Sequence, residues 1–197
     1  MKIIEKDLSE RLYNFLIKYF NVDTEVWSTN RKYRIDYVIE DTQTPGAYFG
    51  IEVKKIDHKR GNDLGEHILQ AYNYSQSEFG NYGKIPIFVV PPLSYDYIIC
   101  PDHDNMKVIE GFEYFKDRHD KNHDHHTING FLGALNLGEM RTQMRTIYPD
   151  KMERQFVRIV FSNQEIWSNI PICGTKEHKG LNRHNYEKLI KKINGKV

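Results

Sequence analysis

The chain has 197 residues, a net charge of +1 and 39% hydrophobic residues, which is enough apolar material for a domain with a substantial core. The near-neutral charge excludes a protein that holds nucleic acid by its global field, so such a partner would need local basic segments or a bound metal. Two distant cysteines, no signal-peptide pattern and no apolar run of membrane-spanning length lead us to expect a cytoplasmic protein without membrane contact.

The first half of the chain predicts a helix, three strands, a second helix and a fourth strand. Apolar residues at helical spacing predict a helix over residues 3–20, and "EVWST" predicts a short strand. "KYRIDYVIE" and "YFGIEVKK" alternate in polarity on either side of the turn segment "DTQTPGA", which predicts a hairpin. A second helix is predicted from Asp63 to Ser77, followed by the buried strand "KIPIFVV". This order is typical of an α/β fold with a mixed sheet.

The second half of the chain has a weaker pattern. "FVRIVF" and "EIW" predict strands, and "NRHNYEKLIKKI" predicts a terminal helix. "GFLGALNLGEMR" lacks the spacing of a phosphate-binding loop and is interpreted as packing. We expect a single domain over residues 1–197, with a catalytic core of about 1–100 and a C-terminal extension of about 101–197.

The predicted hairpin carries an unusual set of charges. Asp36 lies in its first strand, and Glu52 and Lys54 share one face of its second strand. If the register brings these faces together, two carboxylates and an ammonium group converge. Such a set suits Mg²⁺ or Mn²⁺, and the lysine can orient an attacking water. The alternative is an exposed Glu–Lys pair at a sheet edge, which contributes little to stability.

The predicted second helix adds "QAYNYS", in which Gln70 and Tyr74 are four residues apart and share one helical face. With these residues the pattern resembles the PD-(D/E)xK nuclease superfamily, especially its RecB-like branch with a QxxxY helix motif. The resemblance covers about residues 3–92 and departs at Ile35, which stands in place of the motif's proline. It implies a restriction-endonuclease-like core: a helix, a mixed sheet with a hairpin, a crossover helix and a strand.

The resemblance also implies a function, that of a Mg²⁺-dependent nuclease, with a DNA endonuclease as the preferred interpretation. Asp36 and Glu52 would hold Mg²⁺ or Mn²⁺ together with the main-chain carbonyl of Val53. Lys54 would position the nucleophilic water. A homodimer would suit such an enzyme, because cutting both strands of a duplex is simplest with two copies of one centre.

The helical residues of the motif have supporting roles by the same resemblance. Gln70 would steady Lys54 or the substrate backbone, although it could also be an ordinary solvated residue. Tyr74 would support the phosphate, although burial is the favoured expectation for this ring. Many members of the superfamily also carry a glutamate on the first helix, and Glu5 and Glu10 are the candidates here.

Glu5 is our choice for this helical acid. At roughly 100° per residue, Glu5 falls on the apolar stripe with Leu8 and Leu12, whereas Glu10 lies on the opposite side of the helix. A carboxylate within a buried stripe needs a partner, which a metal centre would supply. If the helix began later than residue 5, Glu5 would instead be a capping acid.

Two basic segments, "NRKYR" and "KKIDHKR", flank the proposed centre. Their positions beside the carboxylates suit contacts with DNA phosphates, although ordinary surface charge is the alternative. The residues expected to make these contacts are Arg31, Lys32, Arg34, Lys55, Lys59 and Arg60.

Two other functions compete with this interpretation. One is a catalytically inactive nuclease-fold protein that binds nucleic acid or a protein partner. The other is a zinc-dependent hydrolase built on the histidine cluster of "HDKNHDHHT", although the neighbouring residues are more typical of a solvated loop. The histidines concerned are His119, His123, His125 and His126.

Overall fold

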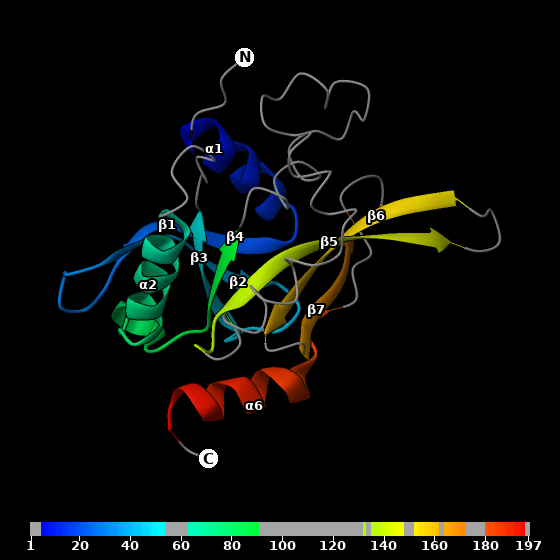
Figure 1. Ribbon diagram of the computed structural model, residues 1–197. Helices are drawn as coiled ribbons and strands as arrows, with labels where there is room; N and C mark the ends of the chain where they lie inside the picture. The colour runs from blue at the N-terminus through cyan, green and yellow to red at the C-terminus, as the bar shows by residue number, and fades with distance from the viewer. Residues whose placement is uncertain are drawn as a thin grey trace.

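The computed structural model describes residues 5–53, 63–90, 132, 135–147, 152–161, 164–171 and 180–195 (Figure 1). Three helices and seven strands make up most of this part of the chain, with one short 3-10 helix, η1, before the fourth strand. In chain order the elements are α1 (Glu5–Leu16), β1 (Phe20–Trp27), β2 (Arg34–Asp41), β3 (Tyr48–Val53), α2 (Asp63–Ser75), η1 (Gly80–Tyr82), β4 (Ile87–Val90), β5 (Gly138–Ile147), β6 (Met152–Phe161), β7 (Gln164–Pro171) and α6 (Arg183–Ile193).

The strands form one seven-stranded sheet whose spatial order is the chain order, β1 to β7. The strands β1, β2 and β3 pair antiparallel, β3, β4 and β5 pair parallel, and β5, β6 and β7 pair antiparallel. The parallel β3–β4 pair requires a crossover connection, and α2 lies on it. The α/β class with a mixed sheet is therefore confirmed.

Helices cover both faces of this sheet. One hydrophobic cluster joins α1 and α6 to one face, and its members include Leu12, Phe49 and Leu189. A second cluster joins α2 to the other face through Ile68, Ala71 and Tyr74. In β4, Ile87 belongs to the second cluster and Phe88 to the first, so this strand is buried on both faces as its apolar run predicts.

The first helix ends earlier than expected. We predict a helix over residues 3–20, but α1 ends at Leu16 and β1 begins at Phe20. The amides of Lys18 and Tyr19 bond to carbonyls three residues back, which tightens the last turn and reverses the chain. Tyr19 is buried in the α1 cluster either way, so the apolar spacing alone does not mark where the helix stops.

The C-terminal strands continue the same sheet, because β5 pairs directly with β4. The predicted boundary near residue 100 therefore does not separate two sheets. Leu132 and Leu137 are buried, which agrees with packing for "GFLGALNLGEMR", but the same segment also opens a strand at Gly138 that the sequence pattern misses. No helix in the part of the chain that the structure describes is long and apolar enough to cross a membrane.

Candidate active site at the open end of the β2–β3 hairpin

Strand β2 changes face at Asp36. Ile35 packs in the cluster beneath α2, whereas Tyr37, two residues later, packs in the cluster beneath α1. Regular alternation would put both side chains on one face. The neighbouring strand is irregular at the same level, since Glu25 of β1 has a φ of 51° in the left-handed region. Asp36 is therefore held at a local twist between two regular stretches of sheet.

The carboxylate of Asp36 is directed to the end of β3. The Val53 amide donates a hydrogen bond to Asp36 Oδ2 at 2.7 Å. Tyr37 pairs with Ile51 at this end of the regular antiparallel register, one residue from Asp36 and two from Val53. The structure therefore brings Asp36 to the Glu52–Val53 peptide, where the sequence places the other two protein ligands of the expected metal ion.

Glu52 is buried, with 2% of its surface exposed. Val53 packs in the α1 cluster, so alternation directs Glu52 toward the face that α2 covers. Burial of a carboxyl group is costly unless hydrogen bonds or positive charge compensate it, so Glu52 marks a place where the fold retains an acidic side chain inside the sheet. An ordinary exposed edge pair, the alternative interpretation of Glu52, is excluded by this burial.

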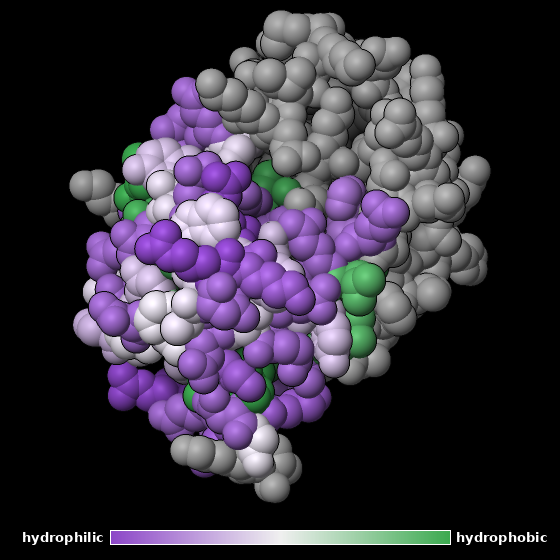
Figure 2. Space-filling model, turned by 90° about the vertical axis from the view of Figure 1, so that its left-hand side faces the viewer, coloured by the Kyte–Doolittle hydropathy of each residue, from purple (hydrophilic) through white to green (hydrophobic). Residues whose placement is uncertain are grey.

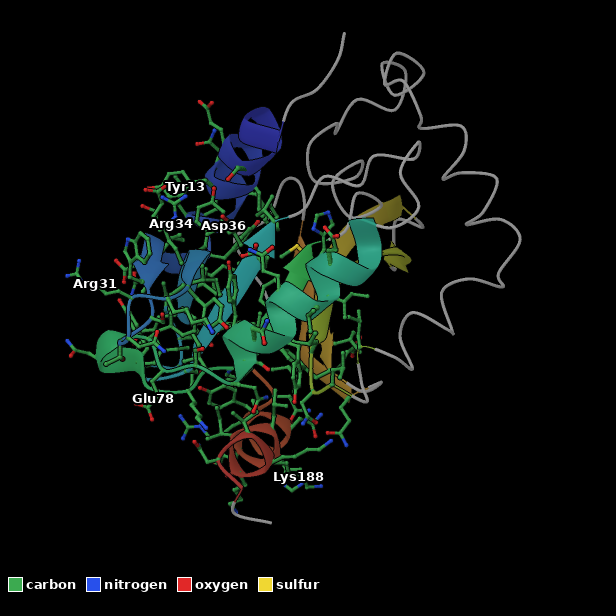
Figure 3. The ribbon with its side chains drawn as sticks, turned by 60° about the vertical axis from the view of Figure 1, so that its left-hand side comes forward. Tyr13, Arg31, Arg34, Asp36, Glu78 and Lys188 are labelled. Carbon is green, nitrogen blue, oxygen red and sulfur yellow. The ribbon has the colours of Figure 1, made fainter. Side chains whose placement is uncertain are left out.

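A cavity of about 480 Å³ opens beside Asp36. It lies between the outer side of α1 and the ends of β1, β2 and β3, and Figure 3 shows Tyr13, Arg34 and Asp36 gathered at this edge. Three of its lining side chains are carboxylates, which gives the cavity a negative character. Its lining residues are Ser9, Glu10, Tyr13, Thr24, Glu25, Asp36, Tyr37 and Val53.

Tyr37 fixes α1 against β2 at the wall of this cavity. Its hydroxyl donates to the main-chain carbonyl of Ser9 at 2.9 Å and also hydrogen-bonds the Ser9 hydroxyl. Burial raises the pKa of Tyr37, the hydrogen bond from Ser9 offsets part of this effect, and the negative charge of Asp36 raises the pKa further. Tyr37 therefore stays neutral at physiological pH and acts as a positioning group.

Among the α1 side chains that the structure describes, Glu10 lines the cavity. The side chain of Glu5 lies outside the described residues. The stripe criterion selects side chains that face the core, whereas a cavity at the edge of the sheet meets the exposed edge of the helix, where Ser9, Glu10 and Tyr13 lie. Their spacing of one and four residues is the signal that could have identified this edge.

Gln70 and Tyr74 contact each other, as their four-residue spacing predicts. The Gln70 amide donates to the Tyr74 hydroxyl. Tyr74 is only 4% exposed, and its ring centroid lies 5.5 Å from that of Tyr33, so the favoured expectation of burial is confirmed. Tyr74 thus holds Gln70 at a defined place on α2 and does not itself offer a surface for phosphate.

Of the predicted DNA contacts, those of "NRKYR" are described. Arg31, Lys32 and Arg34 are all exposed at the β1–β2 hairpin. Arg34 Nη1 lies 3.3 Å from Glu25 Oε1, so this cation borders the cavity. The predicted residues that lie outside the described part of the chain are Lys54, Lys55, Lys59, Arg60, His119, His123, His125 and His126.

The donor set for a cation is small. Within the described ranges, no three histidine, cysteine, aspartate or glutamate side chains are grouped to hold a metal ion. Asp36, Glu52 and the main-chain carbonyl of Val53 are hard oxygen donors of the type that suits Mg²⁺, although Glu52 is not among the described residues that line the cavity beside Asp36. Comparisons of this chain with protein-family models, curated proteins and solved structures found no match. Its function must therefore be argued from the site.

Proposed function

We propose that this protein is a Mg²⁺-dependent DNA endonuclease of the PD-(D/E)xK type with a restriction-endonuclease-like core. One observation carries the proposal: the Asp36 carboxylate reaches the Val53 amide at the open end of the hairpin, beside a carboxylate-lined cavity. This hydrogen bond joins residues 17 positions apart and supports the proposal, because Val53 lies between Glu52 and Lys54 in the sequence.

The roles follow from the donor types. Asp36, Glu52 and the Val53 carbonyl would hold the cation, and Lys54, the next residue, would orient water. When bound, the cation supplies positive charge that stabilises the phosphate as water attacks it and lowers the pKa of that water. Glu10, which lines the same cavity from α1, would act as the helical acid.

The charge of the cavity supports metal dependence. Glu10, Glu25 and Asp36 line one hollow, and a phosphodiester carries a negative charge of its own. Without a cation the cavity would repel the group that it is proposed to cleave. A divalent ion reverses the local potential and admits phosphate. The proposal therefore requires that substrate binding near Asp36 and metal binding are coupled.

The test is cleavage of closed-circular plasmid DNA in Mg²⁺ or Mn²⁺ by the wild type, Asp36→Asn and Glu52→Gln. Both changes keep the side-chain shape and remove the charge, so we expect a loss of at least about a hundredfold in rate. Glu78→Gln is the matched control, because Glu78 is exposed and Figure 3 places it away from Asp36. Linear product without a nicked intermediate would indicate two centres acting together, as in a homodimer.

Calorimetric titration with Mn²⁺ separates cleavage from binding. We expect heat of binding for the wild type and for Glu78→Gln and its loss for Asp36→Asn. Thermal melting of each variant checks that it is folded. A wild type that does not bind Mn²⁺ and does not cut any DNA would contradict the proposal. That result would favour a nuclease-fold protein that only binds its partner.

A further inference from the structure

Trp27 is an exposed aromatic residue beside an arginine. Half of its surface, 50%, is exposed to solvent, whereas the other tryptophan, Trp167, is fully buried. Trp27 ends β1 and pairs directly with Arg34, the first residue of β2. The guanidinium carbon of Arg34 lies 5.8 Å from the centroid of the Trp27 ring. The pair presents an aromatic surface and a positive charge at one place.

The loop that follows Trp27 is held firmly. Ser28 is 2% exposed; its hydroxyl donates to Asn30 Oδ1 at 2.8 Å and accepts from the Tyr33 amide at 2.9 Å. The Thr29 amide donates to the Glu78 carbonyl at 2.7 Å, which ties the hairpin to the segment after α2. Trp27 is therefore mounted on a rigid hairpin, so little conformational freedom would be lost on binding.

Trp27 is also linked to the cavity. Arg34 contacts Glu25 at 3.3 Å, and Glu25 lines the cavity together with Asp36. Arg34 lies two residues before Asp36 on the same strand, and Figure 3 shows both at the same edge of the molecule. A group that stacks on Trp27 would therefore have its neighbouring phosphate near the proposed metal centre.

The surroundings favour a polyanion that carries rings. Arg31, Lys32 and Arg34 are exposed around this hairpin. Figure 2 shows that the described surface on this side is mainly hydrophilic, with hydrophobic residues in small separate groups. A protein partner would usually require a broader apolar patch, whereas an exposed aromatic ring among cations is the pattern of a surface that stacks nucleobases.

We infer that Trp27 and Arg34 form a stacking platform for an unpaired base, and that the substrate is DNA with a single-stranded stretch beside the cleaved bond. In a duplex, neighbouring base pairs cover the faces of each base, so Trp27 can stack only on a base that has left the helix or lies in a single strand. This inference rests on the proposed function for the cut itself, but the stacking can be measured without it.

The test uses the intrinsic fluorescence of the protein. The chain has two tryptophans and Trp167 is fully buried, so quenching by an added oligonucleotide reports on Trp27. Oligothymidylate and an abasic oligonucleotide of equal length carry the same phosphates, but only the first has bases. In metal-free buffer we expect oligothymidylate to quench the emission and to bind about tenfold more tightly than the abasic strand.

Variants complete the test. Because these variants lack the reporting tryptophan, their affinities are measured by the fluorescence anisotropy of dye-labelled oligonucleotides, with the wild type measured in the same way. Trp27→Ala should abolish the preference for thymidylate, whereas Trp27→Phe, which keeps a ring, should retain part of it. Equal affinity for the two strands, or an unchanged preference in a folded Trp27→Ala protein, would overturn the inference.

The same titration with Asp36→Asn separates the two proposals. Asp36→Asn should keep the thymidylate preference while it loses cleavage, because stacking on Trp27 does not need the proposed metal centre. A thymidylate preference in a wild type that cuts no DNA would support the platform and contradict the nuclease proposal. If fully paired and gapped DNA were cut at equal rates, and Trp27→Ala did not change these rates, the stacking inference would be contradicted while the nuclease proposal would still be supported.

Discussion

Backbone strain lies next to the proposed centre. Among the residues that the structure describes, Glu25, Arg31 and Asn136 are the non-glycine residues with positive φ. The first lines the cavity and the second lies at the hairpin that carries Trp27. A left-handed conformation costs an L-residue roughly 1–2 kcal/mol, and such strain gathers at functional sites. At Glu25 it accompanies the twist that directs Asp36 toward Val53.

Substitution at Glu25 tests this strain. Both Glu25→Gly and Glu25→Ala remove the exposed ion pair with Arg34, which contributes little. In a regular strand glycine would be the less stable of the two, but at a φ of 51° we expect Glu25→Gly to be more stable than Glu25→Ala by about 1 kcal/mol. Urea denaturation of the two variants measures the difference, and a more stable alanine variant would show that the backbone is relaxed there.

The β5–β6 ribbon has an unfavourable pairing of charges. Its register places Arg141 opposite Arg158 and Arg145 opposite Arg154. Like charges at directly opposite register positions of an antiparallel pair are in general unfavourable. We therefore expect this register to lower the stability of the ribbon, although the net charge of the whole chain is only +1.

A charge-reversal cycle on this ribbon measures the effect. Arg145→Glu and Arg154→Glu each create an opposite-charge pair, so each should raise the free energy of unfolding by about 0.5 kcal/mol at low salt. The double variant restores like charges and should lose that gain, which excludes a general benefit of lower positive charge. Denaturation of the four proteins at low and high salt checks this, and gains that simply add would contradict the pairing.

At the scale of the whole molecule, α6 packs against the first strand residues of β3 in the β2–β3 hairpin and so links the C-terminal part of the chain to it. The Tyr186 hydroxyl accepts a hydrogen bond from the Tyr48 amide at 3.1 Å, and its ring centroid lies 5.1 Å from that of Phe49. Tyr48 and Phe49 open β3, the strand that ends at Glu52 and Val53. The last helix thus contacts the first residues of β3, and the proposed ligands lie at the other end of this strand.

Tyr186→Phe tests this attachment. The change keeps the ring and leaves the Tyr48 amide without its acceptor, so we expect a loss of about 1 kcal/mol in the free energy of unfolding at neutral pH. Lys188→Ala, on an exposed position of the same helix, is the control and should have little effect. Equal stabilities of Tyr186→Phe and the wild type would show that the hydrogen bond makes no net contribution.

The pH dependence of stability gives an independent measurement on the same side chain. Burial raises the pKa of Tyr186 to about 12. In the unfolded chain the pKa of a tyrosine is about 10. The stabilisation that comes from burying the neutral Tyr186 side chain is therefore fully present below a pH of about 10 and is lost as the pH rises toward about 12. Tyr186→Phe should show a smaller loss in this window. Some loss should remain, because the hydrogen bond to Asp23 also raises the pKa of Tyr82 to about 12.

Periodicity predicts the regular elements well where one pattern dominates. The β2–β3 hairpin, α2, β4 and α6 all lie where the sequence places them, because alternation, turn residues and helical spacing agree there. It fails at the end of α1, where buried residues continue from helix to strand, and at β5, whose first residue follows a glycine-rich apolar segment. In both places the tertiary core, not the local pattern, decides the backbone.

The sequence by itself determined the mixed α/β class and the presence of carboxyl groups at Asp36 and Glu52 on neighbouring strands, because residue types and strand alternation are local properties. Only the tertiary structure decided that Asp36 turns toward Val53, that Glu10 reaches the cavity and that Trp27 stands exposed beside Arg34. These facts depend on a twist in β2, on the angle at which α1 meets the sheet and on which strand end stays uncovered. Such properties arise from contacts between residues far apart in the chain, and no short segment encodes them.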